Sequence, residues 1–259
     1  MQLQALAAFE DNYIWMLSQG TQAWVVDPGD AGPVLHHLDK SGLSLVGVLV
    51  THHHGDHTGG VTQLQQAIAG LEVYAPAGET FRFAHQPVRE GDAIDVLGCA
   101  FKVIDIPGHT AGHVAYVGQP KDQEPLLFCG DTLFYGGCGR LFEGSPEQMW
   151  TSLQRLAALE PSTRVCCAHE YTLANLRFAL AVEPDNEHLQ QAVVACNALR
   201  AQSLPTLPST IARELAINPF LRVRAPQVRA AARHHAPALQ EPAPDSSIFA
   251  ALREWKNNF

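Results

Sequence analysis

Short apolar runs and Gly- or Pro-rich turns alternate along the first 170 residues, a pattern that predicts β-strands joined by tight connections. Helical spacing of apolar positions is expected at Ala31–Lys40 and Thr58–Ile68. A further helix should begin after Ser145, where Ser-Pro-Glu-Gln supplies an N-cap, a proline for the first turn and a capping-box glutamine. The expected strands are Tyr13–Ser18, Ala23–Val26, Leu45–Val50, Leu71–Ala75, Phe101–Ile106, Val114–Val117, Leu126–Cys129 and Arg164–Ala168.

The pattern changes after about Tyr171, where apolar positions recur at helical spacing and no convincing strand is predicted. An Ala- and Pro-rich stretch, Ala225–Ser246, is expected to be irregular or loosely helical. The expected helices are Leu173–Val182, Glu187–Gln202, Ser209–Ile217 and Ser247–Asn257. The sequence therefore predicts an α+β protein with a β-rich domain over residues 1–170 and a helical domain over residues 171–259.

Composition narrows the class of protein. The chain has 259 residues, 46% of them hydrophobic, which is enough to bury a self-supporting core. Its net charge of −9 argues against a nucleic-acid or acidic-membrane partner. No apolar run approaches the ~20 residues needed to cross a bilayer. The N-terminus lacks a basic segment and carries Glu10 and Asp11, unlike a secretion signal. We expect a soluble, cytoplasmic monomer.

The charge is unevenly distributed along the chain. Residues 1–199 carry 9 basic and 22 acidic residues, whereas residues 200–259 carry 8 basic and 4 acidic ones. One interpretation is a basic, solvated helix surface. The other is that the C-terminal segment helps to hold an anionic ligand.

The richest candidate chemistry is the run THHHGDHTGG, which begins at Thr51 directly after an expected strand. The six cysteines contain no CxxC pair, so a Cys-rich zinc site is not expected. His52 and His54 share a face of an extended segment, while Asp56 and His57 follow a glycine that permits a sharp turn. Imidazole and carboxylate together suit Zn, Fe(II) or Mn. The middle histidine points away from its neighbours and is left out of the ligand set.

Three other strand ends can supply the remaining ligands. His109, Asp131 and His169 each follow an expected strand. Each would be weak evidence alone, because a single polar residue at a strand end often only caps the strand. Together with the histidine-rich run they indicate a metal centre built from several strand ends.

The motifs as a set resemble the metallo-β-lactamase superfamily and, within it, the hydroxyacylglutathione hydrolases (glyoxalase II enzymes). The resemblance extends from the N-terminal Asn-Tyr pair to the last expected helix. The motifs that carry it are HxHxDH from His52, PGHTAGH from Pro107, GDTLF from Gly130, GGCGR from Gly136, HEYT from His169, NPF from Asn218 and RxxK from Arg253.

This resemblance implies a four-layer αββα sandwich followed by a helical domain, with two divalent metal ions at one edge of the sheets. Zinc is the expected metal, and iron or manganese would suit the same ligands. By resemblance, the first ion is bound by His52, His54 and His109, the second by Asp56, His57 and His169, and both by Asp131.

The implied reaction is hydrolysis of S-D-lactoylglutathione to D-lactate and glutathione, a step in methylglyoxal detoxification. A water shared by two divalent cations loses a proton near neutral pH and becomes a nucleophile. Asp56 can orient it, and Asp131 holds the metals. The leaving thiolate, with an ordinary pKa of ~8.5, needs no strong general acid.

Glutathione has two carboxylates, and by resemblance its backbone contacts Arg140, Tyr171, Arg253 and Lys256. Arg253 and Lys256 stand three apart on an expected helix and so share a face. A plain basic helix end, favoured by the helix dipole, is the alternative for this pair. Many family members carry Lys where this chain has Arg140 and Tyr where it has Phe142, which removes one hydroxyl from the site.

Three other functions use similar residues. A lactonase or β-lactamase shares the scaffold, but the C-terminal segment with Arg253 and Lys256 argues against it. Persulfide dioxygenases act on glutathione persulfide at a single iron and lack part of the second ligand set, whereas Asp56, His57 and His169 are all present here. A metal-binding protein without catalytic activity is the third alternative, and the complete ligand set argues against it.

Overall fold

The computed structural model describes residues 1–239 and 242–259, and their contacts divide the chain into two compact units. Unit 1 comprises Met1–Asp105, Thr110–Gly130 and Cys166–His169. Unit 2 comprises Ile106–His109, Asp131–Val165 and Glu170–Phe259. The chain thus enters each unit more than once. The expected domain boundary after residue 170 is a division along the sequence and remains a prediction.

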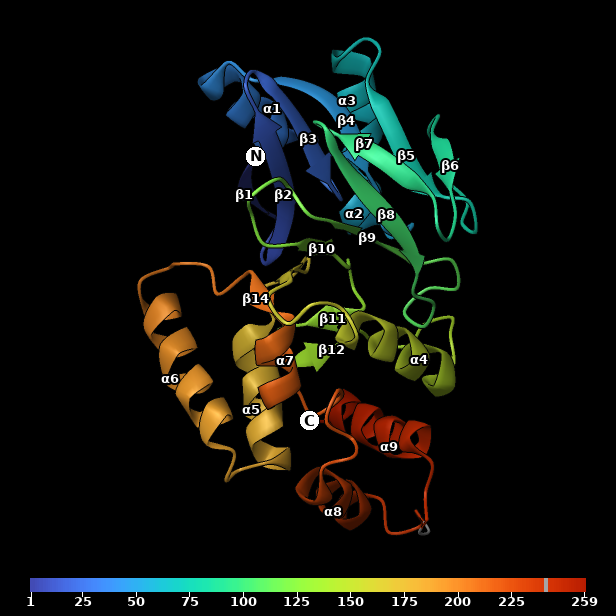
Figure 1. Ribbon diagram of the computed structural model, residues 1–259, viewed down its shortest axis with the longest axis vertical. Helices are drawn as coiled ribbons and strands as arrows, with labels where there is room; N and C mark the ends of the chain where they lie inside the picture. Colours follow the sequence, from blue (N-terminus) through green and yellow to red (C-terminus); the bar gives the residue numbers. More distant parts are fainter. Residues whose placement is uncertain (240–241) are drawn as a thin grey trace. The chain divides into compact units, whose positions relative to one another are not determined.

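Unit 1 contains a six-stranded sheet that starts antiparallel and becomes parallel from β3 onward. Helices α1 (Ala31–Ser41) and α3 (Val61–Ala67) lie beside this sheet (Figure 1), and their apolar residues share its hydrophobic core. Asp30 caps the start of α1, and Gly42, with φ of 70°, ends it. The strands are β1 (Gln2–Ala8), β2 (Asn12–Gln19), β3 (Gln22–Val26), β4 (Ser44–Leu49), β5 (Glu72–Pro76) and β6 (Gln86–Val88).

A second set of strands in unit 1 is antiparallel: β7 (Ala93–Val96), β8 (Cys99–Asp105), β9 (Val114–Gly118) and β10 (Leu126–Phe128). The buried hydroxyl of Tyr116 on β9 donates to the carbonyl of Val50, 2.7 Å away, and ties this set to the end of β4. Because β3 and β4 are parallel, their carboxyl ends lie at the same edge of the sheet. The histidine-rich run starts at that edge.

Unit 2 is mainly helical. A two-stranded hairpin, β11 (Leu133–Phe134) and β12 (Gly137–Cys138), precedes α4 (Pro146–Ala157), which begins with the expected capping box at Ser145. β13 (Arg164–Cys166) pairs antiparallel with β14 (Ser209–Thr210). Contacts join α5 to α6 and α8 to α9, as Figure 1 also shows. The remaining helices are α5 (Thr172–Val182), α6 (Glu187–Ala201), α7 (Ile211–Ile217), α8 (Pro226–His235) and α9 (Asp245–Asn257).

Two expectations for the C-terminal segment were wrong. Strand β14 lies where no strand was predicted; it is two residues long, too short for an alternating pattern to reveal it. The stretch Ala225–Ser246 contains the regular helix α8, which a proline starts and basic residues end. Residues 240 and 241 of that stretch lie outside the described residues. Among the described residues no helix is long and apolar enough to cross a membrane.

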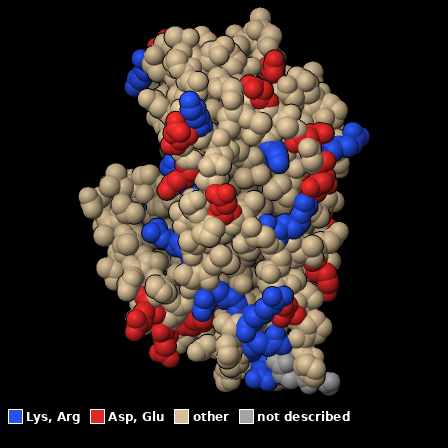
Figure 2. Space-filling model, in the orientation of Figure 1, with Lys and Arg blue, Asp and Glu red and all other residues tan. Residues whose placement is uncertain are grey.

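Figure 2 shows Lys and Arg side chains gathered over α8 and α9 on the face in view, and Arg224 and Arg229 belong to the C-terminal segment. These two share one acidic partner: Asp245 accepts from Arg224 at 2.6 Å and from Arg229 at 3.2 Å. The Arg224 side chain is 74% exposed. These residues fit the interpretation of a solvated helix surface.

Candidate metal centre and substrate pocket

Glycines bring the histidine-rich run close to the turn that follows β3. A Cβ on Gly60 would lie 2.5 Å from the backbone nitrogen of Ala31, and one on Gly59 would lie 2.6 Å from the carbonyl oxygen of Gly29. Only glycine fits at such distances. The run therefore lies against the Asp27-Pro28-Gly29 turn, and the short helix α2 (Gly55–Thr58) within it carries two of the expected ligands.

Asp56, His57 and His169 form one compact group within unit 1, with one donor atom from each lying within 4.8 Å of the others. Asp56 Oδ2 stands 3.6 Å from His57 Nε2 and 3.4 Å from His169 Nε2. Donors of a tetrahedral ion held at about 2.1 Å stand about 3.4 Å apart, so this group fits a divalent metal. The amide of Asn12 donates to the same Asp56 oxygen at 3.1 Å and fixes the carboxylate.

Carboxylates orient both histidines of this group. Asp27 Oδ2 accepts from His57 Nδ1 at 3.0 Å, and Asp11 Oδ1 accepts from His169 Nδ1 at 2.8 Å. With the proton on Nδ1, each imidazole has its lone pair on Nε2, which faces Asp56. This carboxylate–histidine arrangement is typical of metal sites, where it fixes the tautomer and raises the basicity of the ligand.

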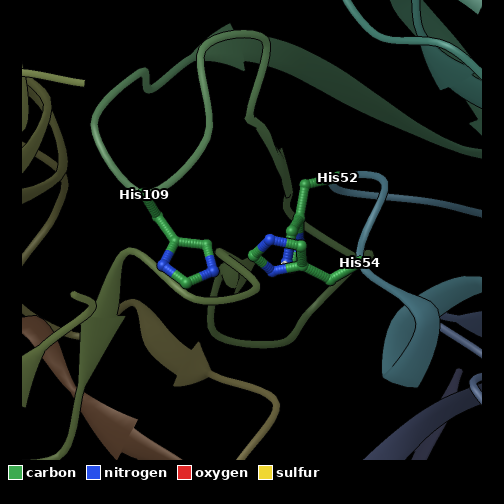
Figure 3. A group of neighbouring side chains, drawn as sticks. All are labelled: His52, His54 and His109. Atoms are coloured by element: carbon green, nitrogen blue, oxygen red, sulfur yellow. Dashed lines mark hydrogen bonds between the residues drawn. The ribbon is translucent and has the colours of Figure 1, made fainter. Parts of the chain in front are cut away.

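His52 and His54 form a second group in unit 1, with His52 Nε2 3.1 Å from His54 Nδ1. Figure 3 shows their rings side by side; the third imidazole it labels, His109, belongs to unit 2. Thr51 Oγ1 donates to Asp27 at 2.7 Å and therefore accepts from His52 Nδ1 at 3.0 Å. Asp27 thus orients His57 directly and His52 through the Thr51 hydroxyl.

The two remaining expected ligands, His109 and Asp131, lie together in unit 2. His109 Nδ1 donates to the Arg140 carbonyl at 2.8 Å, and its Nε2 stands 3.4 Å from Asp131 Oδ2. A Cβ on Gly139 would lie 1.9 Å from the Asp131 carbonyl oxygen, so a glycine is required for this close approach. The seven expected ligands therefore fall into a set of five in unit 1 and a pair in unit 2.

A cavity of about 560 Å³ lies within unit 2 and is walled by the His109–Asp131 pair and by cationic and aromatic side chains. Four aromatic residues line it, and Phe142 is 64% exposed and Phe259 59% exposed. Basic and aromatic groups around one cavity suit an anionic ligand with apolar parts. All four expected substrate contacts lie in its wall: Arg140, Tyr171, Arg253 and Lys256.

Arg253 is only 5% exposed, and backbone and side-chain groups of the protein already engage it. Its Nη1 donates to the Cys138 carbonyl at 2.8 Å, and its Nε donates to Asn257 Oδ1 at 3.2 Å. The guanidinium also lies over the Phe220 ring, 5.1 Å from its centroid. Arg253 therefore holds the pocket wall together as well as lining it.

Lys256 differs from Arg253 in its electrostatics. Its ammonium donates to the Ala174 carbonyl at 3.1 Å. Burial, reinforced by the charges of Arg253, Arg177 and Arg140, lowers the pKa of Lys256 to about 8. A negatively charged group in the cavity would favour the charged form of Lys256.

The aromatic residues form the apolar part of the wall. The Tyr171 ring, at the start of α5, packs edge-on against Phe134 at 5.3 Å and is 37% exposed. The Phe142 ring lies edge-on to the His109 imidazole at 5.2 Å. Phe142 offers no hydroxyl to a ligand at this point.

Sequence reasoning missed the residues that orient the ligands. No motif of the sequence singles out Asp27, which directly follows an expected strand, or Asp11, which lies near the N-terminus. His53, which is not among the expected ligands, pairs with Glu79, 3.0 Å away. His113 stacks on His52 with a ring separation of 4.5 Å and supports it by packing. The sequence offered one signal for Asp27. It is a carboxylate directly after an expected strand, and that strand neighbours the one that leads into the histidine-rich run.

Comparisons with known proteins define the class first. Residues 9–169 match the family model described as "Metallo-beta-lactamase superfamily". The fold is similar to that of ETHE1 from Myxococcus xanthus, with a TM-score of 0.65 and 23% identity over 99% of this chain and 100% of that one. It is also similar to the B3 metallo-β-lactamase BLEG-1, with a TM-score of 0.65 and 21% identity over 85% of this chain and 99% of that one. The predicted α+β metallo-β-lactamase fold with a helical C-terminal region is thus confirmed.

The C-terminal part of the chain identifies the family within this superfamily. Residues 170–259 match the model described as "Hydroxyacylglutathione hydrolase C-terminus". The hydroxyacylglutathione hydrolase of Albidiferax ferrireducens is 56% identical over 259 residues, which span 100% of both chains. That of Vibrio parahaemolyticus is 49% identical over 260 residues, again 100% of both chains. The chain belongs to the hydroxyacylglutathione hydrolase family.

Proposed function

We propose that this chain is a dinuclear metal hydrolase that converts S-D-lactoylglutathione and water into D-lactate and glutathione. The observation that carries the proposal is the donor geometry: expected ligands in both units stand 3.1–3.6 Å from a neighbouring ligand. Two of them, His109 and Asp131, line the same cavity as Lys256. In this proposal the seven expected ligands would hold two divalent metal ions, and Asp131 would serve both.

Two divalent cations held there would acidify a water to make the nucleophile and would polarise the thioester carbonyl. We propose zinc, and the mixed nitrogen and oxygen donors would also accept iron or manganese. A similar solved structure, TTHA1623, is described in a di-iron-bound form; it has a TM-score of 0.55 and 29% identity over 65% of this chain and 92% of that one.

Asp56 is suited to orient the attacking water. Its side chain is 42% exposed, whereas that of His57 is 1% exposed, so the carboxylate is the solvent-facing side of a buried group. Asn12 keeps this carboxylate in place from behind. The water then needs no separate general base close to the carbonyl.

The cavity of unit 2 would hold the glutathione moiety. The Lys256 ammonium is suited to pair with a glutathione carboxylate, and the Arg140 guanidinium can bind a second one through two hydrogen bonds. The Tyr171 hydroxyl is suited to a peptide group of the tripeptide. The thiolate that leaves has an ordinary pKa of ~8.5 and departs without a strong acid beside it.

The test is hydrolysis of S-D-lactoylglutathione by the purified protein, followed as released thiol, with elemental analysis of the same sample. Asp131→Ala should abolish both turnover and the second equivalent of metal, because it removes the bridging carboxylate. Asp39→Ala, the same replacement on the exposed face of α1, should leave both unchanged. A fully metallated wild-type protein that cleaves no glutathione thioester would refute the proposal. One iron per chain with oxygen uptake on glutathione persulfide would favour the dioxygenase alternative. Monomeric state and a cytoplasmic location remain predictions.

A further inference from the structure

The hairpin of β11 and β12 forms part of the pocket wall, although very little of it is held by strand pairing. Its register consists of Leu133 opposite Cys138 and Phe134 opposite Gly137. Phe134 and Cys138 line the cavity. Arg140, which also lines the cavity, stands just after the hairpin.

Asn218, at the end of α7, binds the hairpin from beneath. Its amide nitrogen lies 2.9 Å from the Gly137 carbonyl oxygen and 3.3 Å from the Phe134 carbonyl oxygen, and its two N–H groups are shared among these carbonyls and the Glu214 carboxylate. The amide oxygen accepts from the backbone N–H of Phe220 at 3.1 Å, which fixes the orientation of the side chain. Asn218 is fully buried, so water cannot replace these bonds.

Glu214, one turn earlier on α7, binds the tip of the hairpin. Its Oε2 accepts from the backbone N–H of Gly136 at 2.8 Å and from the Asn218 amide at 2.9 Å. Its Oε1 accepts from the Ser209 hydroxyl. Gly136 has φ of +65°, a conformation that favours glycine, and the carboxylate holds the chain in it.

Two other helices complete this set of bonds. Asn175 on α5 donates to the Tyr135 carbonyl at 3.2 Å, and Arg253 on α9 donates to the Cys138 carbonyl at 2.8 Å. Every residue from Phe134 to Cys138 thus has a backbone group bound by a side chain of α5, α7 or α9, or of the residue that ends α7. The hairpin takes its shape from these side chains more than from its own two strand pairs.

We propose that Asn218 and Glu214 are positioning residues for substrate binding, which fix the pocket wall by holding the backbone of residues 134–138. The kinetic part of this inference rests on the proposed function. Neither side chain lines the cavity, whereas the hairpin that both of them bind does. The NPF motif, which had no role in the metal centre, acquires one here.

Glu214 is a buried carboxyl group, so the effect of its charge can be tested separately from the effect of its hydrogen bonds. Burial raises the pKa of Glu214 to about 7, against the effects of Ser209, Gly136, Asn218 and Arg213, which lower it. Cys196 on α6 and Tyr135 in the hairpin also face this carboxylate: burial raises the pKa of each, and the charge of Glu214 adds to the rise. A glutamine carries no charge; its one oxygen can still accept from Gly136 and Asn218, and its NH₂ group can donate to the Ser209 hydroxyl oxygen.

The first test is Asn218→Ala in the metallated enzyme. The change leaves two buried carbonyls without a donor, and KM should rise at least about tenfold while kcat and metal content stay within about threefold. Asn186→Ala is the matched control. Asn186 donates to the Ala216 carbonyl at 3.0 Å and caps α6, but it does not touch the hairpin. The control should lower the unfolding midpoint without raising KM.

The second test compares Glu214→Ala with Glu214→Gln. The alanine variant should raise KM as Asn218→Ala does, and the glutamine variant should restore KM to within about threefold of wild type. A role limited to folding stability would shift the unfolding midpoint of both variants and leave KM unchanged. The glutamine variant also keeps the question decidable if the alanine variants do not fold.

Amide hydrogen exchange of residues 133–139 separates this inference from the proposed function, because it needs no substrate. Exchange there should accelerate at least about tenfold in Asn218→Ala and remain at the wild-type rate in Asn186→Ala. If the wild-type enzyme cleaves no thioester but this exchange pattern holds, only the proposed function fails. A folded Asn218→Ala protein with wild-type KM and wild-type exchange would overturn the inference.

Discussion

Asp27 is the most informative single position at which to perturb the metal centre. Its side chain is 4% exposed and accepts three hydrogen bonds: from the Thr51 backbone N–H at 2.7 Å, from the Thr51 hydroxyl at 2.7 Å and from His57 Nδ1 at 3.0 Å. Asp27→Ala would leave three buried donors without an acceptor. At about 1–3 kcal/mol for each unsatisfied group, with partial relaxation, we expect the free energy of unfolding to fall by about 3–6 kcal/mol.

Asp27→Asn isolates the effect on the metal. Asp27 has φ of +53°, which asparagine tolerates and alanine does not, so the backbone is spared. The asparagine oxygen can still accept from Thr51, but an NH₂ group then meets His57 and cannot accept its Nδ1 proton. Metal affinity should fall about 10- to 100-fold, the usual cost of losing such a partner.

The assay is competition with a chromophoric chelator, which gives the affinity for each metal equivalent, combined with urea unfolding of the same samples. Asp30→Asn is the control, because it removes the same charge three residues away. Asp30 caps α1 by accepting from the Gly32 backbone N–H at 2.8 Å, a bond that asparagine can also accept, so stability and metal affinity should both stay at the wild-type level. If Asp27→Asn and Asp30→Asn bind metal equally well, the positioning role assigned to Asp27 is wrong.

Two further predictions concern the pocket. The pKa of Lys256 is lowered to about 8, and a bound carboxylate favours its charged form, so KM should rise as the pH increases through 8. Lys256→Gln should remove that pH dependence. A variant whose KM depends on pH as the wild type does would contradict the assignment. Phe142→Tyr should lower KM about twofold to tenfold through one added hydrogen bond to glutathione, with kcat unchanged, and Phe142→Leu, which adds no hydroxyl, should not lower it.

The sequence predicted the elements whose evidence is local. The ligands of the histidine-rich run lie within six residues of each other. The capping box at Ser145 predicted the start of α4, and the structure contains it. The partners of these ligands could not be found in the same way, because Asp11 lies 158 residues from His169 and Asp27 lies 30 residues from His57. Such pairs arise from strand order, which a single sequence does not state.

The hairpin at residues 133–138 escaped prediction for a different reason. A strand is recognised by alternation of apolar and polar positions over several residues, and here both strands are two residues long and fully buried. Their conformation depends on side chains such as Asn218, 81 residues from Gly137. The motif containing Asn218 was visible in the sequence, but its hydrogen-bond partners were not.

The dependence of that hairpin on α5, α7 and α9 bears on how this protein can be recombined. A graft of residues 1–170 onto a different C-terminal module would leave the backbone of residues 134–138 without its donors and its one carboxylate acceptor. An exchange of modules at this boundary would therefore have to carry over Asn175, Glu214, Asn218 and Arg253, or supply a new loop in place of the hairpin. Side chains of the C-terminal helices fix the hairpin that lines the pocket. The segments before and after residue 170 should therefore be exchanged or engineered together.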